Sequence, residues 1–108
     1  MLVKITNNAR DYAWGSTTLI PEYFGVPATG RPMAEVWFGT HEGSPARLVD
    51  TNEPLLTALK GKQLPFLLKI LAADSPLSIQ AHPNSAQASE GFARENAAGI
   101  GLQASDRN

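Results

Sequence analysis

The most informative stretch of the sequence is Pro76-Leu77-Ser78-Ile79-Gln80-Ala81-His82-Pro83-Asn84. Its alternation of polar and apolar residues predicts a half-buried strand over 77–82, with Ser78, Gln80 and His82 on a face that lines a polar cavity. The other face is expected to pack against apolar side chains and carries Leu77, Ile79 and Ala81. Neighbours on one face lie about 6–7 Å apart, so the Gln and His side chains can reach one metal ion between them. From the residues alone, a wet polar face is the simpler interpretation, because a lone His is rarely a ligand.

The chain around this stretch is divided into short segments by eight Pro and nine Gly. Branched and aromatic residues over 34–38 and an apolar run over 66–73 favour strands. Asn84 and Gln87 have the spacing of a capping box, which predicts the start of a helix. The expected strands are 2–6, 34–38, 46–49, 66–73 and 77–82, and the expected helices run from 16 or 17 to 24, over 55–60 and over 84–98. This pattern predicts a mainly β fold with short helices.

The composition excludes several classes of protein. The 108-residue chain has 9 Lys and Arg against 10 Asp and Glu, so a nucleic-acid-binding surface is not expected. It has no Cys, which leaves nitrogen and oxygen donors for any metal. No apolar run approaches the ~20 residues of a membrane span, and the N-terminus lacks a secretory signal pattern. We therefore expect a cytoplasmic protein that binds neither nucleic acid nor a membrane.

Two charged side chains lie in strands that otherwise look buried. Lys69 interrupts the apolar run 66–71, where a charge is costly unless it is paired or faces a polar cavity. The alternative is a strand-edge Lys that reaches water. For Glu35 the same two interpretations apply, a paired charge or an exposed one, and an exposed carboxylate is the simpler interpretation of its sequence pattern. Trp14 precedes a Gly turn, where an aromatic side chain usually packs in a core but can also stack on a ligand.

Five segments of the sequence carry a family resemblance. They are Tyr12-Ala13-Trp14-Gly15-Ser16, Met33-Ala34-Glu35-Val36-Trp37-Phe38-Gly39-Thr40-His41, Leu64-Pro65-Phe66-Leu67-Leu68-Lys69-Ile70-Leu71, the stretch 76–84 quoted above, and Gly91-Phe92-Ala93-Arg94-Glu95-Asn96-Ala97-Ala98-Gly99-Ile100. In this order they resemble the type I phosphomannose isomerases, zinc enzymes of the cupin superfamily. The resemblance covers almost the whole chain. It implies the N-terminal part of a cupin-type (jelly-roll) β-barrel.

The resemblance also implies an activity and a set of site residues. The family interconverts mannose 6-phosphate and fructose 6-phosphate, so the implied partner is a phosphorylated hexose. Its metal ligands carry over to Gln80 and His82, with Zn2+ as the cofactor. Its catalytic cleft carries over to Lys69 and Ser78, and its substrate-lining residues to Trp14 and Glu35. The sequence departs from the common pattern at Glu42, where many members have Pro, and at Ser85, where many have Lys.

The five expected strands are too few to close a barrel. The family's further Glu and His zinc ligands and its catalytic Arg have no counterpart in the sequence. We therefore expect residues 1–108 to be an N-terminal piece of the catalytic domain that is inactive alone, holds zinc weakly or not at all, and self-associates through open strand edges. The alternative is a non-catalytic cupin-type sugar-binding or interaction module.

Overall fold

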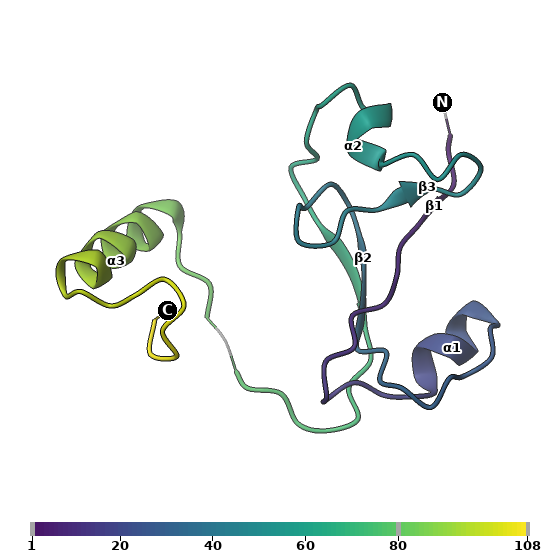
Figure 1. Cartoon of the computed structure of the whole chain (residues 1–108), viewed down its shortest axis with the longest axis horizontal. Helices are drawn as coiled ribbons and strands as arrows, with labels where there is room; N and C mark the ends of the chain where they lie inside the picture. Colours follow the sequence, from purple (N-terminus) through teal and green to yellow (C-terminus); the bar gives the residue numbers. More distant parts are fainter. Residues whose placement is uncertain (1, 80, 108) are drawn as a thin grey trace. The chain divides into compact units, whose positions relative to one another are not determined.

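The computed structural model describes residues 2–79 and 81–107. It divides into two units, Met1–Leu77 and Ser78–Asn108, which are described separately. The elements, labelled in Figure 1, are β1 (Ile5–Thr6), α1 (Leu19–Phe24), β2 (Glu35–Phe38), β3 (Arg47–Leu48), α2 (Leu55–Ala58), β4 (Leu68–Leu71) and α3 (Ser85–Ala97). The predicted combination of short strands and short helices is confirmed, with every strand of the described residues in the first unit.

Two small antiparallel sheets organise the first unit. One joins β1 to β3, and the other joins β2 to β4. In the second sheet Glu35 pairs with Leu71 and Trp37 pairs with Lys69. The N-terminal segment extends this sheet, since the Arg10 N–H donates to the Glu35 carbonyl oxygen at 2.7 Å. Both strands are shorter than their hydrophobic patterns predicted at 34–38 and 66–73.

A small apolar core lies behind β2 and β4. Ile20 of α1, Val36 of β2 and Ala72 are buried together, and four half-buried side chains pack on them: Ala9, Met33, Phe38 and Ile70. Val36 and Ile70 are paired across the two strands, so both point to the core face. The opposite face of the same strand pair is therefore free to carry polar groups.

The turn at residues 12–16 brings the N-terminal segment into contact with this sheet. The Gly15 N–H donates to the Tyr12 carbonyl oxygen at 2.9 Å, and the Ser16 N–H donates to the Ala72 carbonyl oxygen at 2.9 Å. A Cβ atom at Gly15 would lie 2.6 Å from the Cα of Ala34, so only glycine fits there. α1 then begins at Leu19, which places Pro21 in the first helical turn, where a missing N–H costs little.

The second unit is built around α3, whose predicted capping box is present. The Asn84 side chain accepts from the Gln87 N–H at 2.9 Å, and the Gln87 side chain accepts from the Asn84 N–H at 3.0 Å. Arg107 ties the following segment back to this helix. Its side chain is 6% exposed, lies 3.5 Å from the Glu95 carboxylate and donates to the Ile100 carbonyl oxygen at 2.6 Å.

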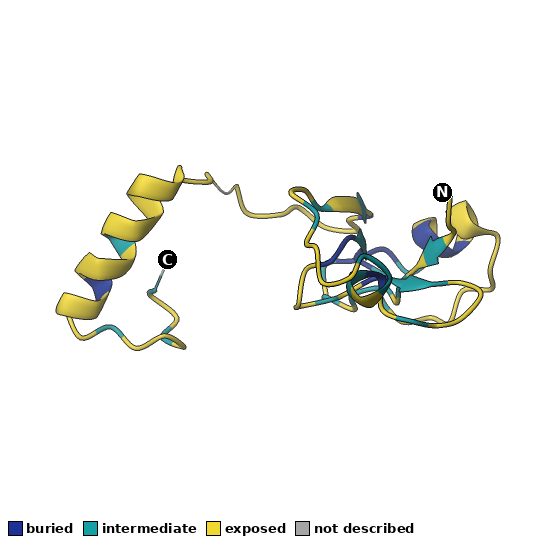
Figure 2. Cartoon of the chain, turned by 90° about the horizontal axis from the view of Figure 1, so that it is seen from above, coloured by how far each residue is buried: buried dark blue, intermediate teal, exposed yellow. Residues whose placement is uncertain are grey.

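The strand predicted over 77–82 is wrong where the structure describes it. Residues 77–79 and 81–82 are not in a strand, and Gln80 lies outside the described residues. Leu77, Ile79 and Ala81 are exposed rather than packed, with Ile79 fully accessible (Figure 2). The physical reason is that the sheets of the described chain contain only β1 with β3 and β2 with β4, so this segment has no ladder partner. The alternation of polar and apolar residues does not by itself provide a partner strand.

The helices of residues 2–79 and 81–107 lack the length and the apolar character of a membrane span.

Replacing Gly15 by alanine tests the close approach of the turn to the sheet. Gly15→Ala is expected to lower the free energy of unfolding of the first unit by roughly 1–3 kcal/mol, because its Cβ would overlap the Ala34 backbone. Urea denaturation followed by tryptophan fluorescence reports on this unit, which contains Trp14 and Trp37. The matched control is Gly91→Ala in α3, where the added Cβ meets only the Arg94 guanidinium at 3.7 Å. That control should stabilise α3 by up to about 1 kcal/mol. An unchanged unfolding midpoint for Gly15→Ala would contradict this close packing.

Candidate functional site

The pairing of β2 with β4 gathers three side chains on the face opposite the core. Glu35 and Trp37 are two residues apart on β2 and therefore point the same way. Lys69 is the direct cross-strand partner of Trp37. Because directly opposite residues project from the same face of a sheet, the ammonium, the indole and the carboxylate are neighbours.

These three groups contact one another directly. The Lys69 Nζ lies 3.7 Å from the Glu35 Oε2 and 4.2 Å from the centre of the Trp37 ring. The Trp37 Nε1–H donates to the same Glu35 oxygen at 2.5 Å. The Glu35 side chain is 11% exposed and that of Lys69 is 40% exposed. The interpretation of Glu35 as an exposed strand carboxylate is thus wrong, whereas Lys69 is both paired and accessible to a ligand.

The N-terminal segment adds a second cation and two aromatic rings beside this cluster. The Arg10 guanidinium carbon lies 5.3 Å from the centre of the Trp37 ring and 5.4 Å from that of Tyr12. Tyr12 and Trp14 are stacked with ring centres 5.6 Å apart. Trp14 is half-buried in its turn rather than enclosed in the core. Neither Arg10 nor Trp37 was predicted as a site residue from the sequence, although the i, i+2 spacing of Glu35 and Trp37 carried the signal for the latter.

Ser78 and His82 belong to the second unit and are described separately from the Glu35–Lys69 pair. Both are exposed, and His82 borders an open hollow of about 1270 Å3 that Glu90, Arg94 and Arg107 also line. Gln80, the other metal ligand implied by the resemblance, lies outside the described residues. The arrangement of Gln80 with His82 therefore stays a prediction.

The described residues contain no group of three or more His, Cys, Asp or Glu side chains that could hold a metal ion. The exposed imidazole of His82 is a suitable donor for zinc, and an amide oxygen beside it would be a second, neutral one. Two such donors leave at least two positions of a tetrahedral zinc site to be filled.

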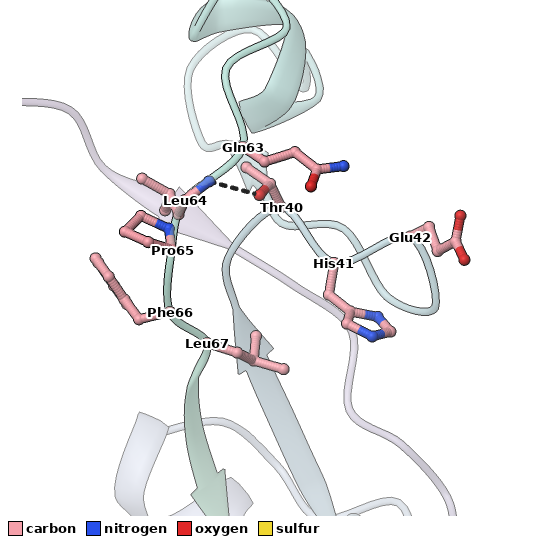
Figure 3. A pocket seen from close by; sticks show the side chains of 8 residues that line it. All are labelled: Thr40, His41, Glu42, Gln63, Leu64, Pro65, Phe66 and Leu67. Atoms are coloured by element: carbon pink, nitrogen blue, oxygen red, sulfur yellow. Dashed lines mark hydrogen bonds between the residues drawn. The ribbon is translucent and has the colours of Figure 1, made fainter. Parts of the chain in front are cut away.

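A cavity of about 480 Å3 lies just beyond the end of β2 and the start of β4, between residues 40–42 and 63–67. Figure 3 shows Thr40, His41, Glu42 and Gln63 on its polar side, and the dashed line marks the bond from the Leu64 N–H to the Thr40 Oγ1 at 3.0 Å. This cavity contains none of the site residues that the sequence indicated.

Comparison with known proteins identifies the family. Residues 2–99 match the model of the phosphomannose isomerase type I catalytic domain. The chain belongs to this family. It is 42% identical to the mannose-6-phosphate isomerases of Salmonella typhimurium and of Escherichia coli, in each case over 97% of this chain and 32% of the relative. A crystal structure of the Salmonella typhimurium enzyme bound to substrate and a zinc atom matches 98% of this chain and 31% of its own, at 41% identity and a TM-score of 0.77. The chain thus spans about a third of the length of these relatives.

A double-mutant cycle tests the contact between Lys69 and Glu35. Lys69→Met is expected to lower the free energy of unfolding by about 1 kcal/mol, because it leaves a largely buried carboxylate without its cation. In the background of Glu35→Gln the same change should cost less, with a coupling of at least about 0.5 kcal/mol. The matched control is Lys62→Met at an exposed loop position, which should leave stability within about 0.5 kcal/mol. Equal costs of Lys69→Met in both backgrounds would show that the pair does not interact.

Proposed function

We propose that this chain is the N-terminal part of the catalytic domain of a zinc-dependent isomerase that interconverts mannose 6-phosphate and fructose 6-phosphate. The observation that carries the proposal is the Lys69–Glu35–Trp37 cluster, an accessible ammonium held beside a carboxylate on one face of the β2–β4 strand pair. Membership of the family and the relative solved with substrate and zinc support it. The place of action is the cytoplasm.

The reaction moves a proton between C1 and C2 of the sugar phosphate while negative charge develops on the carbonyl oxygen. Zinc, when bound, polarises that oxygen. Gln80 and His82 would hold the metal, because both offer neutral donors that leave its charge uncompensated. Their shared place in the segment 76–84 supports this assignment, and the exposure of His82 agrees with a ligand role.

The other site residues would bind and orient the phosphorylated hexose. Lys69 has an ammonium suited to a phosphate or hydroxyl oxygen, and Ser78 has a hydroxyl that can both donate and accept. Trp14, stacked with Tyr12, offers an aromatic surface on which the apolar face of a sugar ring can lie. Glu35, on the face of β2 that also carries Trp37, can accept a hydrogen bond from a sugar hydroxyl.

Within the whole enzyme, the sheets of this chain would form part of a cupin-type barrel. Leu68 and Leu71 of β4 are 59% and 49% exposed. Apolar side chains on the face of a sheet are normally covered by another layer of structure packed against it, and an uncovered apolar face favours contact with a second copy of the chain. This supports self-association of the 108-residue chain.

A graft into a characterised relative tests the proposed activity. Residues 2–107 replace the corresponding third of the Salmonella typhimurium mannose-6-phosphate isomerase, and the purified protein is assayed with zinc for conversion of mannose 6-phosphate to fructose 6-phosphate. We expect an active enzyme in which Lys69→Met lowers kcat/KM by about a hundredfold. Lys62→Met, the same change at an exposed lysine, should leave kcat/KM unchanged.

His82→Ala in the grafted enzyme should in addition release the metal, which is measured by elemental analysis after dialysis. The 108-residue chain alone is the negative control and should show no isomerase activity. A folded graft without activity, or a graft whose activity and zinc content survive both Lys69→Met and His82→Ala, would overturn the proposal. Sugar binding by an inactive, zinc-free graft would favour a non-catalytic module instead.

A further inference from the structure

Trp37 makes more of the contacts in the Lys69–Glu35 cluster than either charged residue. Its indole N–H donates to Glu35, and its ring lies beneath the Lys69 ammonium. The Arg10 guanidinium carbon lies 5.3 Å and the His41 ring centre 5.1 Å from the centre of the Trp37 ring. The residue is half-buried on a central position of the β2–β4 ladder. A side chain placed in this way can set the geometry of its neighbours.

The contact with Glu35 restrains the carboxylate. A hydrogen bond to an ionised acceptor is roughly twice as strong as one between neutral groups, and it is directional. Because Glu35 and Trp37 share one strand and one face, the indole N–H can reach the carboxylate without any change in the backbone. The carboxylate is therefore fixed from its own strand, independently of Lys69.

The contacts of Lys69 are of a different kind. Its Nζ is 3.7 Å from the Glu35 oxygen, which is beyond hydrogen-bond distance, and 4.2 Å from the Trp37 ring centre. The ammonium is thus held by charge and by the π face, and neither contact uses one of its three N–H donors. Those donors remain available to the oxygen atoms of a ligand.

The indole is itself held in place by the N-terminal segment. Arg10 lies over the Trp37 ring and donates from Nη1 to the Gly43 carbonyl oxygen at 2.9 Å. The His41 ring meets the indole edge-on from the following loop, with the two ring centres 5.1 Å apart. The ring is therefore restrained by Arg10 as well as by its own strand.

We propose that Trp37 is a positioning residue of the site: it fixes the Glu35 carboxylate through its N–H and presents the Lys69 ammonium, with its N–H donors free, to the oxygens of an anionic, hydroxyl-bearing ligand. The inference rests on the proposed function for the identity of that ligand as a phosphorylated hexose. The contacts of Trp37 with Glu35 and Lys69 do not depend on any activity. The geometry of these contacts and their effect on catalysis are therefore tested separately.

The geometry is tested by NMR on the 108-residue chain with 13C-labelled lysine. The ring current of Trp37 should move the ε-methylene protons of Lys69 upfield from those of the exposed Lys62. Trp37→Leu should abolish this displacement, and Trp37→Phe, which keeps a smaller ring, should retain part of it. Phe38→Leu is the matched control, since Phe38 is adjacent on β2 but points to the core face. A Lys69 signal that coincides with Lys62 in the unsubstituted chain, or that Trp37→Leu leaves unmoved, would overturn the inference.

The consequence for catalysis is tested in the grafted enzyme. Trp37→Leu should lower kcat/KM by about a hundredfold, as expected when a reacting group is misplaced. The loss should be markedly smaller in the Lys69→Met background, because the part of it that acts through Lys69 is already absent there. A purely structural role would give the same loss in both backgrounds and would contradict the proposal. Failure of the proposed function would appear differently, as a graft insensitive to Lys69→Met whose Lys69 signal still depends on Trp37.

Discussion

The antiparallel register of β2 and β4 is the constraint on which the site of this chain depends. Trp37 faces Lys69 across the ladder, and Glu35 lies two residues before Trp37 on the same face of β2. A shift of one residue would turn Lys69 toward Val36 and bury an ammonium in the apolar core. The cost of burying that charge opposes the shifted register, so the core and the polar cluster specify the same pairing.

Several features of this arrangement could be predicted from the sequence because they depend on neighbours along the chain. The Asn84–Gln87 capping box is an example, since both partners lie within one helical turn. The branched and aromatic residues around Val36 and the continuous apolar run around Ile70 likewise predicted two strands, because these residue types favour extended backbone. The family resemblance indicated Lys69, Glu35 and Trp14 as site residues, and the structure places Lys69 in contact with Glu35. Their roles in binding and catalysis are proposals.

Other features depend on contacts between distant segments and left no local pattern. Glu35 looks like a surface carboxylate in sequence, and its burial follows from the indole of Trp37 and from Lys69 on the neighbouring strand, which is remote in the sequence. Arg10 reaches Trp37 only because the N-terminal segment bridges to β2. Around Ile79 the alternating residues predicted a strand, but the described residues there form none. Alternation predicts which face each side chain takes once a strand is paired, but pairing itself requires a second strand.

The register of β2 against β4 is measured most directly by cross-strand nuclear Overhauser contacts between their backbone protons. The account predicts contacts centred on the pairs Trp37–Lys69 and Val36–Ile70, together with contacts from the Trp37 ring to the Lys69 side chain. Contacts that instead pair Trp37 with Leu68 or Ile70 would contradict it, because Lys69 would then lie on the core face and away from Glu35.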